Sequence, residues 1–120
     1  MISQNKSFYD SEKWVRTRKQ VLIRDKYMDR YQMRYGKFRN AEIVHHIFPL
    51  KEYPEYAYEL WNLISVSKAT HNMFHDRSTD ELTEIGAEVL RRICKKRNME
   101  VPDKYKKKEK THKIKYTEWY

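Results

Sequence analysis

AEIVHHIFPLKEYPEYAYELWNLISVSKATHNMFH, residues 41–75, is the stretch that decides the fold. Ile43 and Val44 lead into a histidine pair and Pro49 follows, which predicts a strand over residues 41–47. Residues 60–66 predict a second strand or the approach to a helix. Ser67 is a suitable N-cap for a helix through about residue 76. Four of the five histidines in the chain lie in this window, which indicates one metal site rather than scattered core histidines.

The histidines fall into two pairs with different geometry. His71 and His75, four positions apart on a helix, share one face at about 6 Å between Cβ atoms, so both imidazoles can reach one cation. His45 and His46 are adjacent on a strand and point to opposite faces. One of them can bind a metal while the other stays free as a general base, because the pKa of imidazole lies close to neutral pH. The alternatives are two surface histidines on a short helix, and one buried and one exposed histidine with no common role.

Asn62 lies between the two histidine pairs in an apolar run. A buried amide without partners costs about 1–3 kcal/mol, so Asn62 needs hydrogen bonds. Its amide is expected to bond either a loop backbone or the histidine base, and so to fix the position of that group. The alternative is that an asparagine after a tryptophan simply marks a turn or bulge.

The charge of the chain is divided into three zones. The 120 residues carry a net charge of +9, are 39% hydrophobic and have a mean hydropathy of -1.06, which predicts one domain with a modest core. Residues 1–40 hold 11 Lys/Arg against 4 acids, residues 41–82 hold 3 against 7, and residues 83–120 hold 12 against 6. An acidic centre between basic arms is typical of a protein that holds a cation and binds a polyanion such as nucleic acid.

Helices are predicted on both sides of the window. Residues 11–26 form a helix capped by Ser11, with an apolar stripe of Trp14, Val15, Val21 and Leu22. Gly36 marks a turn.

A last helix over residues 79–97 is capped by Ser78 or Thr79, and residues 102–120 form a basic, flexible or loosely docked tail. Cys94 is the only cysteine, which excludes an internal disulfide and a thiolate zinc cluster. No signal peptide and no transmembrane segment is expected, so a cytoplasmic location is predicted, the host cytoplasm if the chain is phage-encoded.

The order of these residues resembles the HNH endonuclease family, in the compact form often carried by bacteriophages. The pattern is VHHIFPL, an asparagine sixteen residues after His46, and then THNMFH; the likeness extends over residues 22–75. It implies an α+β fold with a ββα-metal, treble-clef-like core, in which a hairpin and one helix lie between N- and C-terminal helices. The nuclease domain would span residues 1–101, with its motif core at residues 41–76.

The resemblance also implies a role for each motif residue. His45, His71 and His75 would bind one divalent metal ion (Mg, Mn, Ni or Zn), His46 would activate the attacking water, and Asn62 would brace the base loop. The reaction would be hydrolysis of DNA phosphodiester bonds, as a nick or a double-strand cut. By analogy with compact phage members, the chain would act in genome packaging beside the large terminase; homing or restriction roles are alternatives. Duplex DNA with weak sequence preference is the expected substrate, contacted by basic residues of the N-terminal arm: Arg16, Arg18, Lys19, Arg24, Arg30, Arg34 and Arg39.

One departure from the family concerns zinc. Many phage members carry two C-x2-C pairs that bind a structural zinc, and these cysteines would fall at Asp29, Gln32, Ser67 and Thr70. Because this set is poor in zinc ligands, we expect no structural zinc and expect hydrogen bonds among the four residues in its place.

Two other functions fit the sequence. One is a non-catalytic nucleic-acid-binding module that retains the HNH fold, which the charge and the aromatic residues support equally well. The other is a metal-binding structural or interaction domain.

Overall fold

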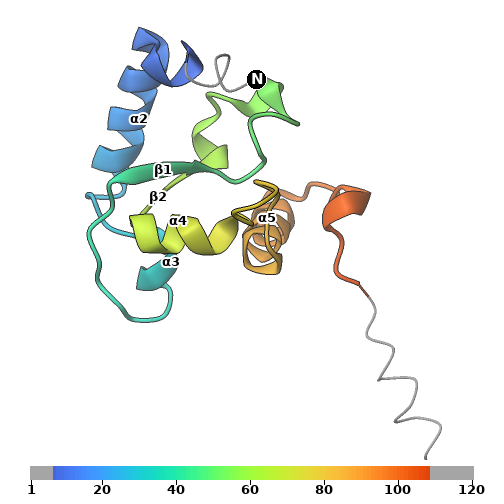
Figure 1. The fold of residues 1–120 in the computed structure, drawn as a ribbon. Coiled ribbons are helices and arrows are strands. Elements are labelled where there is room, and N and C mark those ends of the chain that lie inside the picture. The colour runs from blue at the N-terminus through green and yellow to red at the C-terminus, as the bar shows by residue number, and fades with distance from the viewer. Residues whose placement is uncertain (1–6, 109–120) are drawn as a thin grey trace, which may run out of the picture.

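The computed structural model describes residues 7–108. Its centre is a two-stranded antiparallel sheet of β1 (Ile43–His46) and β2 (Leu63–Val66). The register pairs Ile43 with Val66 and His46 with Leu63. Helix α2 (Glu12–Arg24) lies on one side of this sheet and α4 (Lys68–Phe74) on the other, as Figure 1 shows. The mixed α and β architecture predicted from the sequence is confirmed, with strands shorter than expected.

The N-terminal half of the chain follows the predicted helix and turn. Ser11 caps α2 by accepting a hydrogen bond from the Trp14 amide. Trp14 and Val21 are buried as the apolar stripe predicts, but Val15 is 53% exposed, so its assignment to the stripe is wrong. After α2 comes the short helix α3 (Arg30–Met33), and then a turn in which Gly36 has φ +76°.

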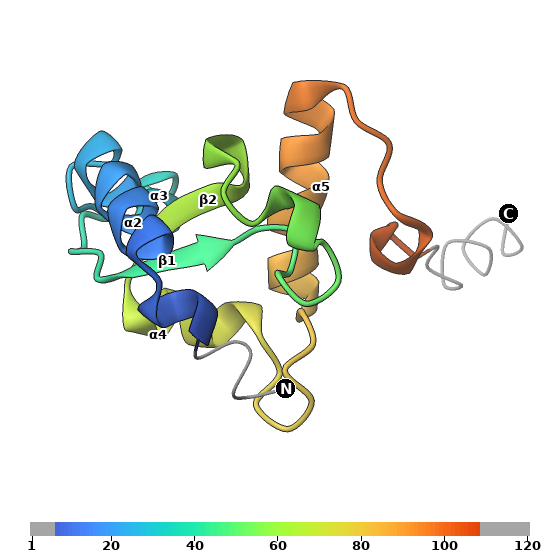
Figure 2. The same cartoon turned by 90° about the horizontal axis from the view of Figure 1, so that it is seen from above.

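Two apolar clusters lie on opposite sides of the sheet. The first joins α2 to the strands, and the second fills the space between the sheet, α4 and α5 (Glu84–Arg97). Seen from above in Figure 2, α2 and α5 lie at opposite ends of the sheet. The fully buried members of the two clusters include Val21 and Leu63 on the α2 side and Val66, Phe74 and Leu90 on the α5 side.

Helix α5 begins later than the sequence predicts. Its N-cap is Thr83, not Ser78 or Thr79. The Asp76 carboxylate accepts hydrogen bonds from the backbone amides of Ser78 and Thr79, which turns that segment into a loop instead of a helix. A glycine is required at position 86 of α5, because a Cβ there would lie 2.5 Å from the Phe74 carbonyl oxygen.

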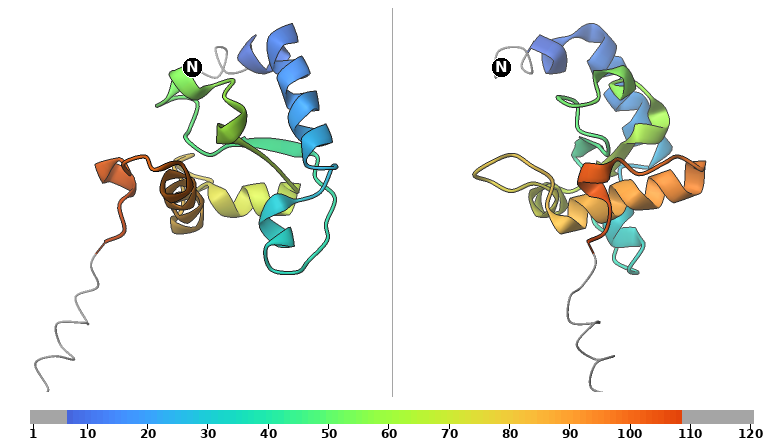
Figure 3. Two further views of the ribbon diagram at one scale, coloured as in Figure 1. Left: turned by 180° about the vertical axis from the view of Figure 1, so that it is seen from behind. Right: turned by 90° about the vertical axis from the view of Figure 1, so that its right-hand side faces the viewer.

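The predicted tail is partly packed on the fold. Residues Asp103–Tyr105 form a 3-10 turn beside α5, which both views of Figure 3 show. Tyr105 is buried, its hydroxyl bonds the Glu52 carboxylate, and its carbonyl accepts from Arg91 at 2.8 Å. Ordered structure therefore continues past the boundary predicted at residue 102, while residues 109–120 of the predicted tail lie outside the described residues. Among residues 7–108, no helix is long and apolar enough to cross a membrane.

Candidate metal centre

Three histidines from three different segments meet beneath β1. His45 is near the end of β1, His71 is on α4, and His75 directly follows that helix. One ring nitrogen from each of the three lies within 4.8 Å of the others. His75 is not helical as predicted: its φ of -126° and ψ of 141° are extended, and it pairs with Leu82 in an isolated β-bridge. The helix ends at Phe74, about two residues earlier than predicted, yet the His75 ring still lies 4.9 Å from the His71 ring between centroids.

The buried state of His45 fits a metal ligand. Both of its ring nitrogens are buried without a hydrogen-bond partner among the described residues. A buried polar atom without a hydrogen-bond partner lowers the free energy of unfolding by about 1–3 kcal/mol, so in native proteins such an atom normally has a functional role or an additional partner. Burial holds the pKa of His45 well below its usual range, and the nearby His71 and His75 rings lower it further. A neutral imidazole is the form that binds a cation, and a bound cation would satisfy one of these nitrogens.

The other two rings are also suited to binding a cation. Burial lowers the pKa of His71, and the neighbouring His75 adds to this effect while Asp80 opposes it. Nδ1 of His75 lies 3.4 Å from the Asp80 carbonyl oxygen, which can only accept, so Nδ1 carries the proton in this contact. This leaves Nε2 of His75 with the lone pair, and a carbonyl partner of this kind orients many metal-binding histidines.

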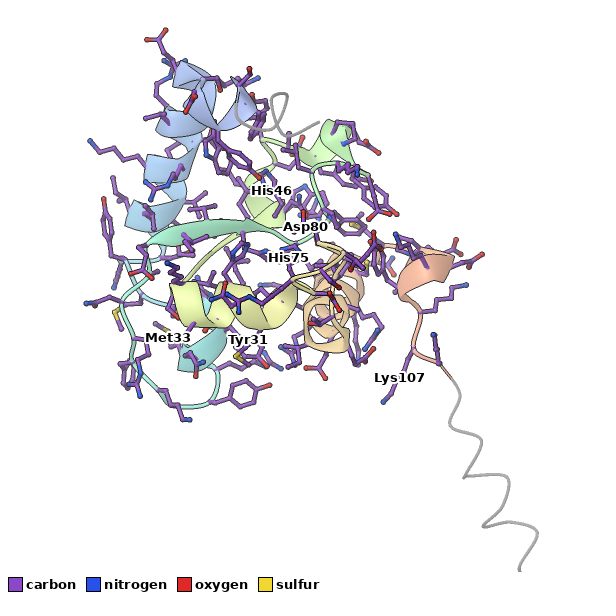
Figure 4. The ribbon with its side chains drawn as sticks, viewed as in Figure 1. Tyr31, Met33, His46, His75, Asp80 and Lys107 are labelled. Atoms are coloured by element: carbon purple, nitrogen blue, oxygen red, sulfur yellow. The ribbon has the colours of Figure 1, made fainter. Side chains whose placement is uncertain are left out.

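His46 lies on the opposite side of β1 from the three-histidine cluster. Figure 4 shows His46 toward α2 and His75 toward α4, the separation expected for adjacent strand residues. Nε2 of His46 donates to the Ala57 carbonyl at 3.0 Å, so the lone pair is on Nδ1. Burial lowers the pKa of His46 to about 4, although the bond to Ala57 raises it. The ring is therefore neutral at pH 7, with one nitrogen available as a proton acceptor.

Asn62 braces the loop that carries Ala57. Its side-chain oxygen accepts from the Phe48 amide at 2.7 Å, and its amide group donates to the carbonyls of Phe48 and Tyr56 at 3.2 and 3.3 Å. Asn62 is fully buried. Of the two partners that the sequence allows, the structure shows the loop backbone and not the histidine.

The two histidine groups open into one cleft of about 530 Å³. Its walls include His46 on one side and His45, His71 and His75 on the other, together with the cations Arg18 and Lys51. Carboxylates also lie along the cleft, at Glu42, Glu52, Asp80 and Glu81. Lys104 offsets two of them, since its ammonium lies 2.8 Å from oxygens of both Glu52 and Glu81.

The basic residues predicted to contact DNA fall into three groups: one lines the cleft, two form ion pairs with Asp25, and four are exposed elsewhere. Arg18 lines the cleft, whereas Arg24 and Arg30 both pair with the buried Asp25 at 2.8 Å. Arg24 also donates to the carbonyls of Leu60 and Leu63, so its guanidinium links the end of α2 to the segment that holds β2. The remaining predicted residues are exposed and do not line the cleft: Arg16, Lys19, Arg34 and Arg39. Lys51 and the Trp14 ring at the cleft were not predicted as site residues, because neither belongs to a motif.

The four residues at the expected zinc positions are hydrogen-bonded to one another, as predicted. The Asp29 carboxylate accepts from the backbone amides of Gln32 and Ser67, both at 2.8 Å. The Gln32 side chain donates to the Thr70 hydroxyl at 3.1 Å, and the Ser67 hydroxyl donates to the same oxygen at 3.1 Å. Asp29 and Thr70 are fully buried. This network, the Asp29 knuckle, ties the start of α3 to the start of α4.

Comparison with known proteins identifies the family. The crystal structure of the HNH endonuclease of the deep-sea thermophilic bacteriophage GVE2, with manganese ion, superimposes with a TM-score of 0.56 at 37% sequence identity. The match covers 58% of this chain and 76% of that one. No protein-family model matches the chain, and neither does any curated protein. The sequence resemblance is thus confirmed by a solved structure: the chain belongs to the HNH endonuclease family.

Proposed function

We propose that the chain is a metal-dependent endonuclease that hydrolyses phosphodiester bonds of DNA. One observation supports this above all: His46, which is neutral at pH 7 and has a free ring nitrogen, and the cluster of His45, His71 and His75 line the same cleft. A water-activating group and a cation site in one cleft are what hydrolysis of a phosphodiester requires.

The metal would be held by His45, His71 and His75. A divalent ion bound there supplies positive charge that stabilises the phosphate and the leaving oxygen in the transition state. Imidazole ligands favour Mn, Ni or Zn over Mg, although Mg is abundant in cells. The orphaned nitrogens of His45 support this assignment most directly.

His46 would be the general base. Its Nδ1 takes a proton from water as the water oxygen attacks phosphorus, the bond from phosphorus to the 3′ oxygen breaks, and the leaving oxygen takes a proton from solvent. The bond from Nε2 to the Ala57 carbonyl fixes the tautomer, and Asn62 holds the loop that presents this carbonyl. The low pKa of His46 keeps its ring unprotonated at neutral pH.

DNA would enter across the cations of the cleft. Arg18 and Lys51 are placed to contact phosphates beside the reacting group, and the exposed Arg16, Lys19, Arg34 and Arg39 would extend this contact along the backbone. Arg24 and Arg30 are better explained by their bonds to Asp25. Weak sequence preference follows from contacts to phosphate alone. Genome packaging beside a large terminase stays a prediction from the family resemblance.

The test is cleavage of supercoiled plasmid by the purified chain with Mg, Mn, Ni or Zn. Wild type should give relaxed or linear product, EDTA should abolish it, and His46→Ala should lose at least a hundredfold in rate while still binding plasmid. A matched control is His112→Ala, which changes a histidine outside the motif. No cleavage with any metal, with plasmid binding retained, would leave the non-catalytic binding module as the better explanation.

A further inference from the structure

A second hollow lies directly beside the cleft. It has a volume of about 340 Å³, and its wall shares Arg18 and Glu42 with the cleft. The remaining lining is mainly apolar, from Val15, Leu22 and Ala41, with the side chains of Lys19 and Tyr27 at its edge. The two hollows are therefore neighbours on the surface, with Arg18 and Glu42 forming the wall between the histidine cleft and the outer face of α2.

The apolar groups of this hollow are more exposed than the fold requires. Val15 is 53% exposed on the surface of α2, and Tyr27 is 47% exposed. Neither packs in the two apolar clusters of the core. The exposed apolar surface of this hollow is small, so the charged side chains around it decide what it can bind.

The backbone at Tyr27 is held in an unfavourable conformation. Lys26 and Tyr27 have φ values of 56° and 55°, in the left-handed region that residues with bulky side chains rarely adopt. The corner is fixed by a bond from the Tyr27 amide to the Leu22 carbonyl and by another from the Ala41 amide to the Tyr27 carbonyl, both 2.8 Å. These two residues end α2 in a common way, because the Lys26 amide bonds the Ile23 carbonyl and the Tyr27 amide bonds the Leu22 carbonyl. The same corner brings Tyr27 into the lining of the hollow.

The charge of the hollow favours an anionic occupant. The Arg18 guanidinium donates to the Glu42 carbonyl oxygen at 2.7 Å, which places it between the two hollows. The Glu42 carboxylate is engaged elsewhere, because it accepts a hydrogen bond from the Lys68 amide at the start of α4. Arg18 and Lys19 therefore present two cations beside the apolar surface. A flat apolar surface with cations at its edge suits a base or sugar with a phosphate on either side.

We propose that this hollow is a substrate subsite that holds a nucleotide next to the scissile phosphate. The Tyr27 ring and Val15 would contact the base or sugar of that nucleotide, while Arg18 and Lys19 would bind the phosphates that flank it. The proposal of this subsite rests on the proposed nuclease function, and it adds where the DNA strand runs once it leaves the cleft. It also explains why Val15 is exposed.

The experiment compares variants of the hollow with matched controls elsewhere. The control for Tyr27→Ala is Ile23→Ala, which removes an apolar side chain that is 57% exposed near the end of α2. The control for Lys19→Ala is Lys95→Ala, which removes an exposed cation on α5. Binding to a fluorescent DNA duplex is measured by anisotropy in EDTA, over a series of salt concentrations. Melting temperatures show that each variant is folded, and Tyr27→Phe retains the ring.

Each variant has a distinct expected result. Tyr27→Ala should weaken binding of the duplex roughly tenfold with no change in salt dependence, because apolar contact between the ring and a sugar is not ionic, and Tyr27→Phe should bind like wild type. Lys19→Ala should reduce the slope of log affinity against log salt by about one phosphate contact, whereas Lys95→Ala should not.

A second measurement locates the nucleotide. At a mapped cleavage position, single abasic sites are placed in turn along the substrate strand. Removal of the base that occupies the subsite should raise KM for wild type and have little further effect on Tyr27→Ala. Equal binding by Tyr27→Ala, Lys19→Ala and their controls would overturn the subsite. Plasmid cleavage by wild type would still stand in that case, so the subsite and the nuclease proposal fail separately.

Discussion

The indole of Trp14 is stacked on the imidazole of His46, with ring centroids 4.9 Å apart and 23° between the planes. Because α2 carries Trp14 and β1 carries His46, this contact couples the N-terminal helix to the proposed base. The bond to the Ala57 carbonyl restrains the same ring in its own plane. The stack and the hydrogen bond together leave the ring one orientation.

Replacement of Trp14 is therefore expected to affect turnover more than substrate binding. Trp14→Ala should lower kcat about tenfold or more with little change in KM, because a misplaced base lowers the rate of proton transfer, and Trp14→Phe should recover most of the loss. Steady-state cleavage kinetics measure this split. Trp61→Ala is the control, since Trp61 packs against Phe48 and Tyr56 and not against a site histidine. A similar fall in kcat for Trp61→Ala would show that the effect is only loss of stability.

Measurements of metal binding should distinguish the roles of His45 and His46, the two neighbouring histidines of β1. His45→Ala and His71→Ala are expected to lower the affinity for Mn by at least tenfold, while His46→Ala binds Mn like wild type. Isothermal titration calorimetry with MnCl2 measures this directly. In the wild type, Mn at a hundred times its Kd should add about 2.7 kcal/mol to the free energy of unfolding. Loss of Mn binding in His46→Ala would mean that the roles of the two histidines are assigned the wrong way round.

Asn62→Ala should destabilise the fold by roughly 2–4 kcal/mol, because it leaves the Phe48 amide and carbonyl buried without partners. Urea denaturation followed by tryptophan fluorescence gives the change. Asn40→Ala is the control, since that side chain is exposed. An Asn62→Ala variant as stable as Asn40→Ala would show that the loop is held by other contacts.

The Asp29 knuckle predicts a pH-dependent stability difference. Burial opposes ionisation of Asp29, but hydrogen bonds from Thr70, Gln32 and Ser67 outweigh it and hold the pKa of this carboxyl below its usual range. A depressed pKa gives stability that is present above the unfolded pKa of about 3.9 and is lost as pH falls through the folded value. Asp29→Asn should therefore be roughly 2–3 kcal/mol less stable than wild type at pH 7.

The difference between wild type and Asp29→Asn should narrow below about pH 4, as the wild-type carboxyl takes up a proton. Denaturation curves at a series of pH values measure it, and Asp103→Asn, which changes an exposed carboxyl, serves as the control. A difference that is constant from pH 7 to pH 3 would show that ionisation of Asp29 contributes nothing.

Removal of the C-terminal turn should lower stability. A chain of residues 1–101 loses the buried Tyr105 ring and its bonds to Glu52 and Arg91, at a cost of about 2 kcal/mol, whereas a chain of residues 1–108 keeps them. Thermal denaturation of the two truncated chains compares them. Equal melting temperatures would restore residue 102 as the end of the stable domain.

The histidine pattern predicts the centre of the molecule well because its geometry is local. Adjacent strand residues must face opposite ways, and this alone separates His45 from His46. The end of α4 was misplaced because helix length depends on tertiary contacts: the bridge from His75 to Leu82 ends the helix at Phe74. The late start of α5 has a similar cause, since the Asp76 side chain accepts hydrogen bonds from the backbone amides of Ser78 and Thr79 and holds them in a loop.

Residues that act through distant partners could not be predicted. Arg24 and Arg30 look like surface cations in the sequence, and only the fold brings both to Asp25. Val15 fits the period of the apolar stripe, but no part of the described chain covers it. Periodicity identifies one face of a helix and not whether every position on that face meets a neighbour.

The chemistry of the Asp29 knuckle makes this part of the fold resistant to oxidants and to thiol reagents. It is built from a carboxylate, an amide and two hydroxyls, none of which is oxidised by peroxide or alkylated by thiol reagents. A thiolate knuckle in the same place would lose its shape under oxidative stress. Because no metal is needed to hold this network together, a chelating agent would leave it in place.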